Sequence, residues 1–152
     1  MSSTDLDQLE DWVAPLLARL EPKQRRQLAR RVATTLRQSQ RERIKAQENP
    51  DGSGFTPRKP QHRQKAGAIR RRGMFHKLRT AKYLRTRGTS DAAVAGFFGR
   101  INRIARVHQY GLHDQVDRDG PRVKYAERRL LGFSEADREA IRDALLEHLT
   151  PP

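Results

Sequence analysis

The chain has 152 residues, of which 35% are apolar and 33% are charged, and its net charge at pH 7 is +14. This is one domain's worth of sequence with a small core, so we expect burial to be completed by self-association. The absence of cysteine excludes disulfides, thiolate catalysis and Cys-based zinc sites. Without a membrane-length apolar run or a signal-like N-terminus, we expect synthesis and residence in a cytoplasm and no membrane partner.

Apolar residues recur at helical spacing near the N-terminus. Leu6, Leu9 and Val13 predict a first helix that reaches about Leu20, and Pro15 is expected to kink or divide it. Three acidic residues lie where the positive end of the helix dipole favours negative charge: Asp5, Asp7 and Glu10.

A second helix is predicted from Pro22 to about Glu48. Proline suits a first helical turn, because the N–H that it lacks would have no partner there. The predicted apolar stripe consists of Leu28, Val32, Leu36 and Ile44, beside Ser39 or Arg43. The turn-forming sequence Asn49-Pro50-Asp51-Gly52 is expected to end the helix.

The segment from about residue 54 to residue 72 is rich in Pro, Gly, Gln and Arg and poor in apolar residues. Because so little surface cannot offset the entropy of ordering, we expect a mobile basic arm within a single domain of residues 1–152. Its basic residues are Arg58, Lys59, Arg63, Lys65, Arg70, Arg71 and Arg72. They belong to a longer basic block, from Gly52 to Ser90, that contains no Asp or Glu.

A β-hairpin is predicted after the arm. Residues 81–86 and 92–98 flank the turn-like sequence Arg87-Gly-Thr-Ser-Asp91, and the second of these segments alternates small and apolar residues. A helix over residues 74–84 stays open as an alternative.

A short helix is predicted to follow the hairpin. Ile101, Ile104, Ala105 and His108 fall on one helical face, and Gly111 is placed to end the helix in the left-handed conformation.

The rest of the chain predicts a strand and a closing helix. Val123 to Tyr125 form the expected strand after Asp119-Gly120-Pro121. Ser134 and Asp137 have the spacing of a capping box, and the apolar residues of the helix are Ile141, Ala144, Leu145 and Leu149.

No pattern indicates catalysis, a cofactor or a metal. The five histidines, at positions 62, 76, 108, 113 and 148, lack the spacing that would place two imidazoles on one face. We expect His108 to be a hydrogen-bonded residue packed near Tyr110 and the hairpin, and His113 to lie in a loop. A calcium loop at Asp114 is rejected, because Tyr125 stands where the bidentate Glu is needed. The chain is therefore expected not to be an enzyme.

Apolar and arginine side chains gather in two short segments, and this mixture is typical of protein interfaces. About half of the apolar ones are expected in the core, and the others are candidate anchors between protomers. The members are Phe97, Phe98, Arg100, Arg128, Arg129, Leu130, Leu131 and Phe133.

Nucleic-acid binding is the alternative that the basic block raises. Its Arg and Lys side chains could neutralise phosphates, and Phe75 and Tyr83, which lie between them, could stack on bases. Aromatic residues make up only 6% of the chain, and no helix-turn-helix or RNP-like pattern is present. The alternative is therefore a small basic protein that binds nucleic acid without sequence specificity.

Four motifs together resemble one known family. Ile101 to Gly111 reads INRIARVHQYG, and Val123 to Gly132 reads VKYAERRLLG before Phe-Ser. Two further motifs lie upstream. One is the Asn-Pro-Asp-Gly turn and the residues after it as far as Lys59, and the other is MFHKLR, residues 74–79. In this order and spacing they resemble the phage virion morphogenesis family, the tail completion proteins of contractile-tailed temperate phages, over about residues 6–149.

The resemblance implies a fold and a role. The fold is α+β, with long N-terminal helices and a C-terminal helix packed on a small antiparallel sheet. The role is that of a structural virion protein, assembled in the bacterial host cytoplasm, that forms a sixfold ring at the head-proximal end of the tail tube. Implied partners are tail tube, tail terminator or sheath proteins and the head connector, with non-specific DNA contact left open and no cofactor.

Overall fold

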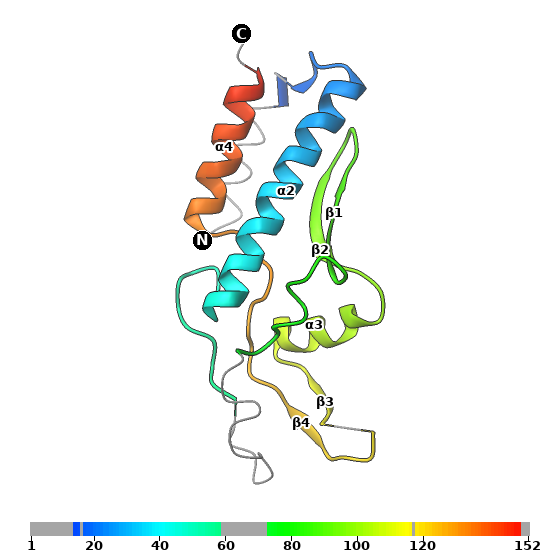
Figure 1. Ribbon diagram of the computed structural model, residues 1–152, viewed down its shortest axis with the longest axis vertical. Helices are drawn as coiled ribbons and strands as arrows, with labels where there is room; N and C mark the ends of the chain where they lie inside the picture. The colour runs from blue at the N-terminus through cyan, green and yellow to red at the C-terminus, as the bar shows by residue number, and fades with distance from the viewer. Residues whose placement is uncertain (1–13, 16, 59–72, 117, 150–152) are drawn as a thin grey trace. The chain divides into compact units, whose positions relative to one another are not determined.

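The computed structural model describes residues 14–15, 17–58, 73–116 and 118–149. These residues form two compact units. Figure 1 shows the helices and strands that belong to them. The first unit contains described residues 14–15, 17–39, 85–96 and 133–149, and the second contains 40–58, 73–84, 97–116 and 118–132. The expectation of one domain over residues 1–152 stays a prediction.

The α+β class is confirmed. The helices are α2 (Pro22–Ala46), α3 (Ile101–Tyr110) and α4 (Glu135–Leu149). The strands are β1 (Leu84–Gly88), β2 (Ala93–Phe97), β3 (His113–Gln115) and β4 (Arg122–Lys124). Within the described ranges they form two separate two-stranded sheets, β1–β2 and β3–β4, rather than one. No helix in these ranges is both long and apolar enough to span a membrane.

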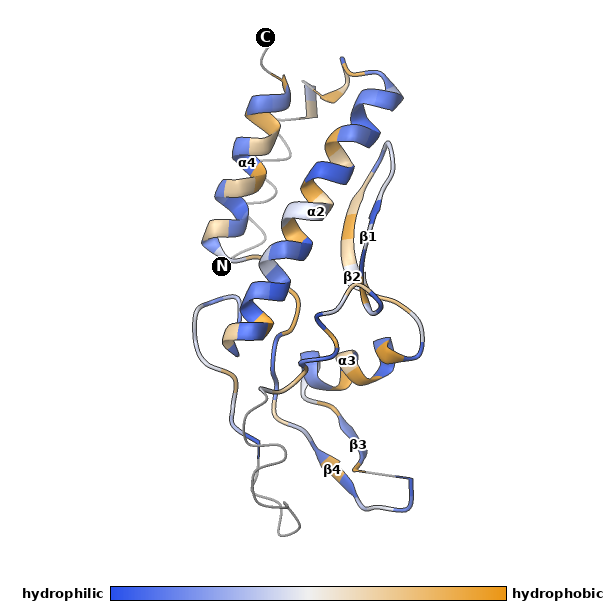
Figure 2. Ribbon diagram, in the orientation of Figure 1, coloured by the Kyte–Doolittle hydropathy of each residue, from blue (hydrophilic) through white to orange (hydrophobic). Residues whose placement is uncertain are grey.

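The first unit packs the beginning of α2 against α4 and most of the β1–β2 hairpin. Apolar residues recur between polar ones along the ribbons of α2 and α4 (Figure 2). The buried cluster consists of Leu28, Val32, Leu36, Ile141, Ala144 and Leu145, with Leu17, Leu20, Ala93, Ala95 and Leu149 at its edge. The predicted stripes of the second and closing helices therefore meet here. Most of the predicted first helix lies outside the described residues.

The capping box that was predicted for the closing helix is confirmed. The Ser134 N–H donates to Asp137 Oδ2 at 2.9 Å, and the Asp137 N–H donates to Ser134 Oγ at 3.1 Å. The Ser39 hydroxyl, from α2, donates to Asp137 Oδ1. The buried Asp137 therefore both begins α4 and joins it to α2.

The second unit has its own core, assembled from short segments that are distant in sequence. Its buried members are Ile44, Phe55, Leu78, Leu84, Phe97, Ala105 and Leu130, with Met74, Phe75, Ile101 and Leu131 packed against them. Phe55 lies at the beginning of the expected arm, so that end of the segment is held by the core.

Three glutamine side chains each bind both backbone polar groups of a distant residue in this unit. Gln47 binds Met74 through two bonds of 2.8 Å, and Gln109 binds Leu131 through bonds of 2.8 and 2.9 Å. Gln40 binds Gly132 in the same way. The glutamines supply the partners that buried backbone groups outside a sheet require.

The end of α2 differs slightly from the expectation. The helix ends at Ala46 rather than near Glu48, because Gln47 adopts a left-handed φ of 61° and binds Met74. The predicted turn follows: the Asn49 N–H donates to the Ser53 carbonyl at 2.8 Å, and Gly52 has a φ of 90°.

The predicted hairpin is confirmed, with its first strand shifted to Leu84–Gly88. Residues 74–83 form turns, so the alternative of a helix over 74–84 is wrong. The predicted strand near Val123 is confirmed as β4. Its antiparallel partner β3 was not predicted, and His113, expected in a loop, pairs there with Lys124.

Candidate interaction surface

The two motif segments of the second unit pack against each other. The Arg128 N–H donates to the His108 carbonyl at 2.8 Å, and the Tyr125 N–H donates to the Leu112 carbonyl at 3.0 Å. Gly111 ends α3 in the left-handed conformation, as predicted, and a Cβ there would lie 3.1 Å from the Glu127 nitrogen. The second motif segment therefore donates backbone hydrogen bonds to the first motif and to the residue that follows it.

His108 lies among aromatic rings in this packed region. Its ring centroid is 4.7 Å from that of Phe75 and 4.9 Å from that of Tyr125. Burial and, after it, the positive charge of Arg128 lower the pKa of His108 from 6.5 to about 4, so the imidazole is neutral at pH 7. These ring contacts come from Phe75 and Tyr125, whereas Tyr110, the expected neighbour, is 64% exposed.

Arg128 is a buried cation that holds the chain at the beginning of the expected arm. Its Nε donates to the Thr56 carbonyl at 2.7 Å, and Nη2 donates to the Pro57 carbonyl at 3.3 Å. Burial and the nearby Arg58 lower its pKa. Of the basic residues predicted for the arm, only Arg58 is described; Lys59, Arg63, Lys65, Arg70, Arg71 and Arg72 lie outside the described residues. The arm therefore stays a prediction.

The predicted interface residues differ in their exposure to solvent. Phe97, Leu130 and Arg128 are buried, and Leu131 is partly buried, whereas Arg100 and Arg129 are exposed. Phe98, in the second unit, and Phe133, in the first, are each 40% exposed. About half of the apolar members therefore belong to the cores, and the exposed ones stay candidate anchors.

A surface hollow of about 760 Å³ lies along one side of α3 in the second unit. We call it the α3 groove; its lining residues are Gly99, Arg100, Asn102, Arg103, Ile104, Arg106, Val107 and Leu112. Ile104 shared the predicted helical face with the buried Ala105, yet it is 45% exposed and lines the groove. The groove therefore combines apolar side chains with three arginines.

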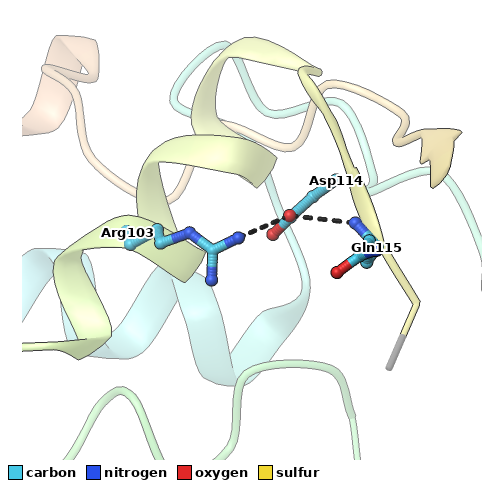
Figure 3. A network of polar contacts seen from close by, with 3 residues as sticks. All are labelled: Arg103, Asp114 and Gln115. Atoms are coloured by element: carbon cyan, nitrogen blue, oxygen red, sulfur yellow. Dashed lines mark hydrogen bonds and ion pairs between the residues drawn. The ribbon is translucent and has the colours of Figure 1, made fainter. Parts of the chain in front are cut away.

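One of these arginines has an acidic partner (Figure 3). Arg103 Nη2 donates to Asp114 Oδ1 at 2.6 Å, and the same oxygen accepts the Gln115 N–H at 2.9 Å. Within the described ranges, no acidic side chain pairs with Arg100 or Arg106. The first turn of α3 also contains no acidic residue. The groove therefore has positive charge available for a negatively charged partner.

The described residues contain no group of three or more His, Asp or Glu side chains that could hold a metal ion. The features that these ranges do present are suited to binding. They are an apolar groove with unpaired arginines and an exposed phenylalanine on each unit. The predicted interface residues did not include Arg103, Ile104, Arg106 or Leu112, although the mixture of Arg and Ile along one short helix was the available signal.

Comparison with known proteins gives one family and one relative. The model of the phage virion morphogenesis family matches residues 4–150. The tail completion protein S of Escherichia phage P2 is 39% identical to this chain over 147 residues, which cover 95% of this chain and 97% of that protein. No solved structure matches.

Proposed function

Because the chain belongs to the phage virion morphogenesis family, we propose that it completes the head-proximal end of a contractile phage tail as a ring of identical copies. The observation that carries this proposal is the similarity to a tail completion protein over 95% of the chain. The role needs no catalysis, since binding free energy alone can finish the tail and present a new surface to the head connector.

The exposed side chains support self-association. Phe98, Phe133 and Ile104 expose apolar surface that a neighbouring molecule can bury, and exposed arginines accompany them. A contact between two different surfaces of identical copies closes into a ring when the rotation allows it. A sixfold ring matches the symmetry that the resemblance implies for the tube.

The proposed partners lie on the two faces of this ring. Tail tube, tail terminator or sheath proteins contact one face, and head connector proteins contact the other. The chain is then a virion component that assembles in the bacterial host cytoplasm. The arm orders when the ring docks, so deletion of residues 59–72 leaves rings intact and blocks head joining. Infectious particles made with the arm-deleted chain would contradict this role of the arm.

Reconstitution of head joining tests the proposal. A phage that lacks this gene is expected to produce separate heads and tails, and the purified chain is expected to restore joining. A gold label on the chain should appear by electron microscopy at the head-proximal end of the tail. Full joining without the chain, or a label elsewhere on the particle, would refute the proposal.

Non-specific nucleic-acid binding is the second candidate. The observation that favours it is α2, whose sequence contains nine Lys or Arg residues and one acidic residue, Glu42. A phosphate binder with six to ten contacts loses roughly a thousandfold or more in affinity between about 50 and 200 mM salt. A duplex-binding titration across that range tests this candidate: a steep loss of affinity with rising salt supports it, and the absence of duplex binding at about 50 mM salt contradicts it.

A further inference from the structure

The α3 groove presents a defined chemistry. Ile104 and Leu112 provide exposed apolar surface, and Arg100 and Arg106 provide positive charge without an acidic partner among the described residues. Arg103 is already paired with Asp114, at 2.6 Å. A ligand that fits is therefore a short segment with apolar side chains on one face and several carboxylates beside them.

The chain itself contains such a segment in residues 1–13. Its sequence, MSSTDLDQLEDWV, has four acidic and no basic residues: Asp5, Asp7, Glu10 and Asp11. It therefore contributes −4 to a net charge of +14, and all other residues together carry +18. Leu6, Leu9 and Val13 repeat at helical spacing, so its sequence predicts an amphipathic helix. We call residues 1–13 the acidic segment.

We propose that the α3 groove of each copy binds the acidic segment of a second copy. The carboxylates of the segment approach Arg100 and Arg106 and the first turn of α3, which lacks an acidic residue. Its apolar face covers Ile104 and Leu112, which are 45% and 38% exposed. Charge complementarity and apolar burial thus favour the same occupant.

This inference builds on the proposed ring by naming a contact between its copies. The groove and the acidic segment are two different surfaces, so their contact is head-to-tail. Such a contact leaves one free groove and one free segment on every pair, and growth ends only when the ring closes. An isologous contact would instead end growth at the dimer.

Binding of a peptide tests the contact directly. The probe is a fluorescent peptide of residues 1–13, and the receptor is the full chain with its own acidic segment neutralised by D5N, D7N, E10Q and D11N. The peptide is expected to bind, and Arg100→Glu with Arg106→Glu is expected to weaken binding by at least about tenfold. The matched control is Arg118→Glu with Arg122→Glu, two exposed residues of the same unit that give the same change in charge.

Mixing two full-length variants tests whether the occupant comes from a second copy. One variant carries the neutralised segment and an intact groove, and the other carries Arg100→Glu with Arg106→Glu and an intact segment. Each alone is expected to be monomeric by light scattering. An equimolar mixture is expected to form dimers and nothing larger, because each pair retains a single competent contact.

Several outcomes would overturn the inference. These are wild-type-sized oligomers from either variant alone, a mixture that stays monomeric, or an unmodified chain that is monomeric while the peptide still binds. A groove variant that loses DNA-duplex binding but keeps its oligomeric state would assign the groove to nucleic acid.

If both variants instead restore head joining, the docking inference fails while the proposed function stands. If the wild-type chain forms the contact but restores no joining, the proposed function fails alone.

Discussion

The side chain of Gln40 binds both backbone polar groups of Gly132, a residue 92 positions away in the chain. Its Nε2 donates to the Gly132 carbonyl at 3.0 Å, and its Oε1 accepts the Gly132 N–H at 3.1 Å. Gln40 is 3% exposed, so water cannot replace these bonds. The pair joins α2 to the end of the second motif segment within the second unit.

The Gln40→Leu variant is expected to be less stable by about 1–3 kcal/mol, because the partly buried Gly132 N–H loses its acceptor. Arg43 still donates to the Gly132 carbonyl at 3.1 Å, which limits the loss. Urea unfolding measures the difference. Gln27→Leu, at an exposed position of the same helix, is the control and should change stability by less than about 0.5 kcal/mol. Equal effects of the two substitutions would contradict the role of Gln40.

Gly132 should also be intolerant of a side chain. A Cβ at this position would lie 2.5 Å from Pro50 Cγ, so Gly132→Ala forces the turn and the motif segment apart. We expect a loss of about 1–3 kcal/mol in thermal or urea unfolding. At Gly96 nothing lies within 4 Å of the added Cβ, so Gly96→Ala is the matched control. The prediction is wrong if both alanine variants have the same unfolding midpoint as the wild type.

Stability should fall as the pH drops from about 6.5 to 4. The pKa of His108 is about 4 in the folded chain and 6.5 in the unfolded chain. Over that range the unfolded chain binds the additional proton, which lowers the free energy of unfolding. Because the ring is only half-buried, the loss is on the order of 1–2 kcal/mol. His108→Phe should flatten the dependence in urea unfolding at several pH values, and parallel curves for the two proteins would exclude His108 as its source.

Asp137 is predicted to stabilise the first unit through its cap and its bond with Ser39. Asp137→Ala removes the acceptor of the Ser134 N–H as well as that of the Ser39 hydroxyl, with an expected cost of about 1–3 kcal/mol. Asp143→Ala removes the same charge from an exposed position of α4 and serves as control. Thermal unfolding, monitored through the circular dichroism signal of the helices, should give a lower midpoint for Asp137→Ala than for Asp143→Ala. Indistinguishable midpoints would argue against the cap.

Phe98 is predicted to contribute to assembly rather than to folding. It is 40% exposed, so Phe98→Asp should leave a folded, soluble chain and yield monomers by size exclusion with light scattering. Phe133→Asp tests the same idea on the first unit. Leu131 is a poorer choice, because it packs against the second core. Val116→Asp, at another exposed apolar position, is the control, and unchanged assembly of the Phe98 variant would count against the interface.

Local patterns predicted much of the secondary structure. The stripe from Leu28 to Leu36, the glycine at position 111 and the Ser134–Asp137 spacing each depend on neighbours within a few residues, and the structure confirms all three. β3 was missed because His113-Asp-Gln115 has no apolar alternation, and pairing with Arg122–Lys124 is what makes it a strand.

The candidate surface was also hard to predict, because the exposure of a side chain depends on contacts between distant segments. Sequence reasoning identified Phe98 and Arg100, yet it placed Ile104 on the same face as Ala105. Whether an apolar side chain is covered or exposed depends on which segments pack over it. The α3 groove is lined from both α3 and Leu112, beyond the helix end, so its lining depends on the path of the chain after Gly111.

By itself, the sequence determined the helix periods, the turn and cap chemistry and, through the order of four motifs, the family. Each of these depends on local spacing or on the order of residues along the chain. Only the tertiary structure decided that Gln40, Gln47 and Gln109 bind distant backbone groups, that Arg128 is buried, and that His108 lies among aromatic rings. Such contacts join residues 17 to 92 positions apart, and an isolated side chain has no periodicity that would reveal its partner.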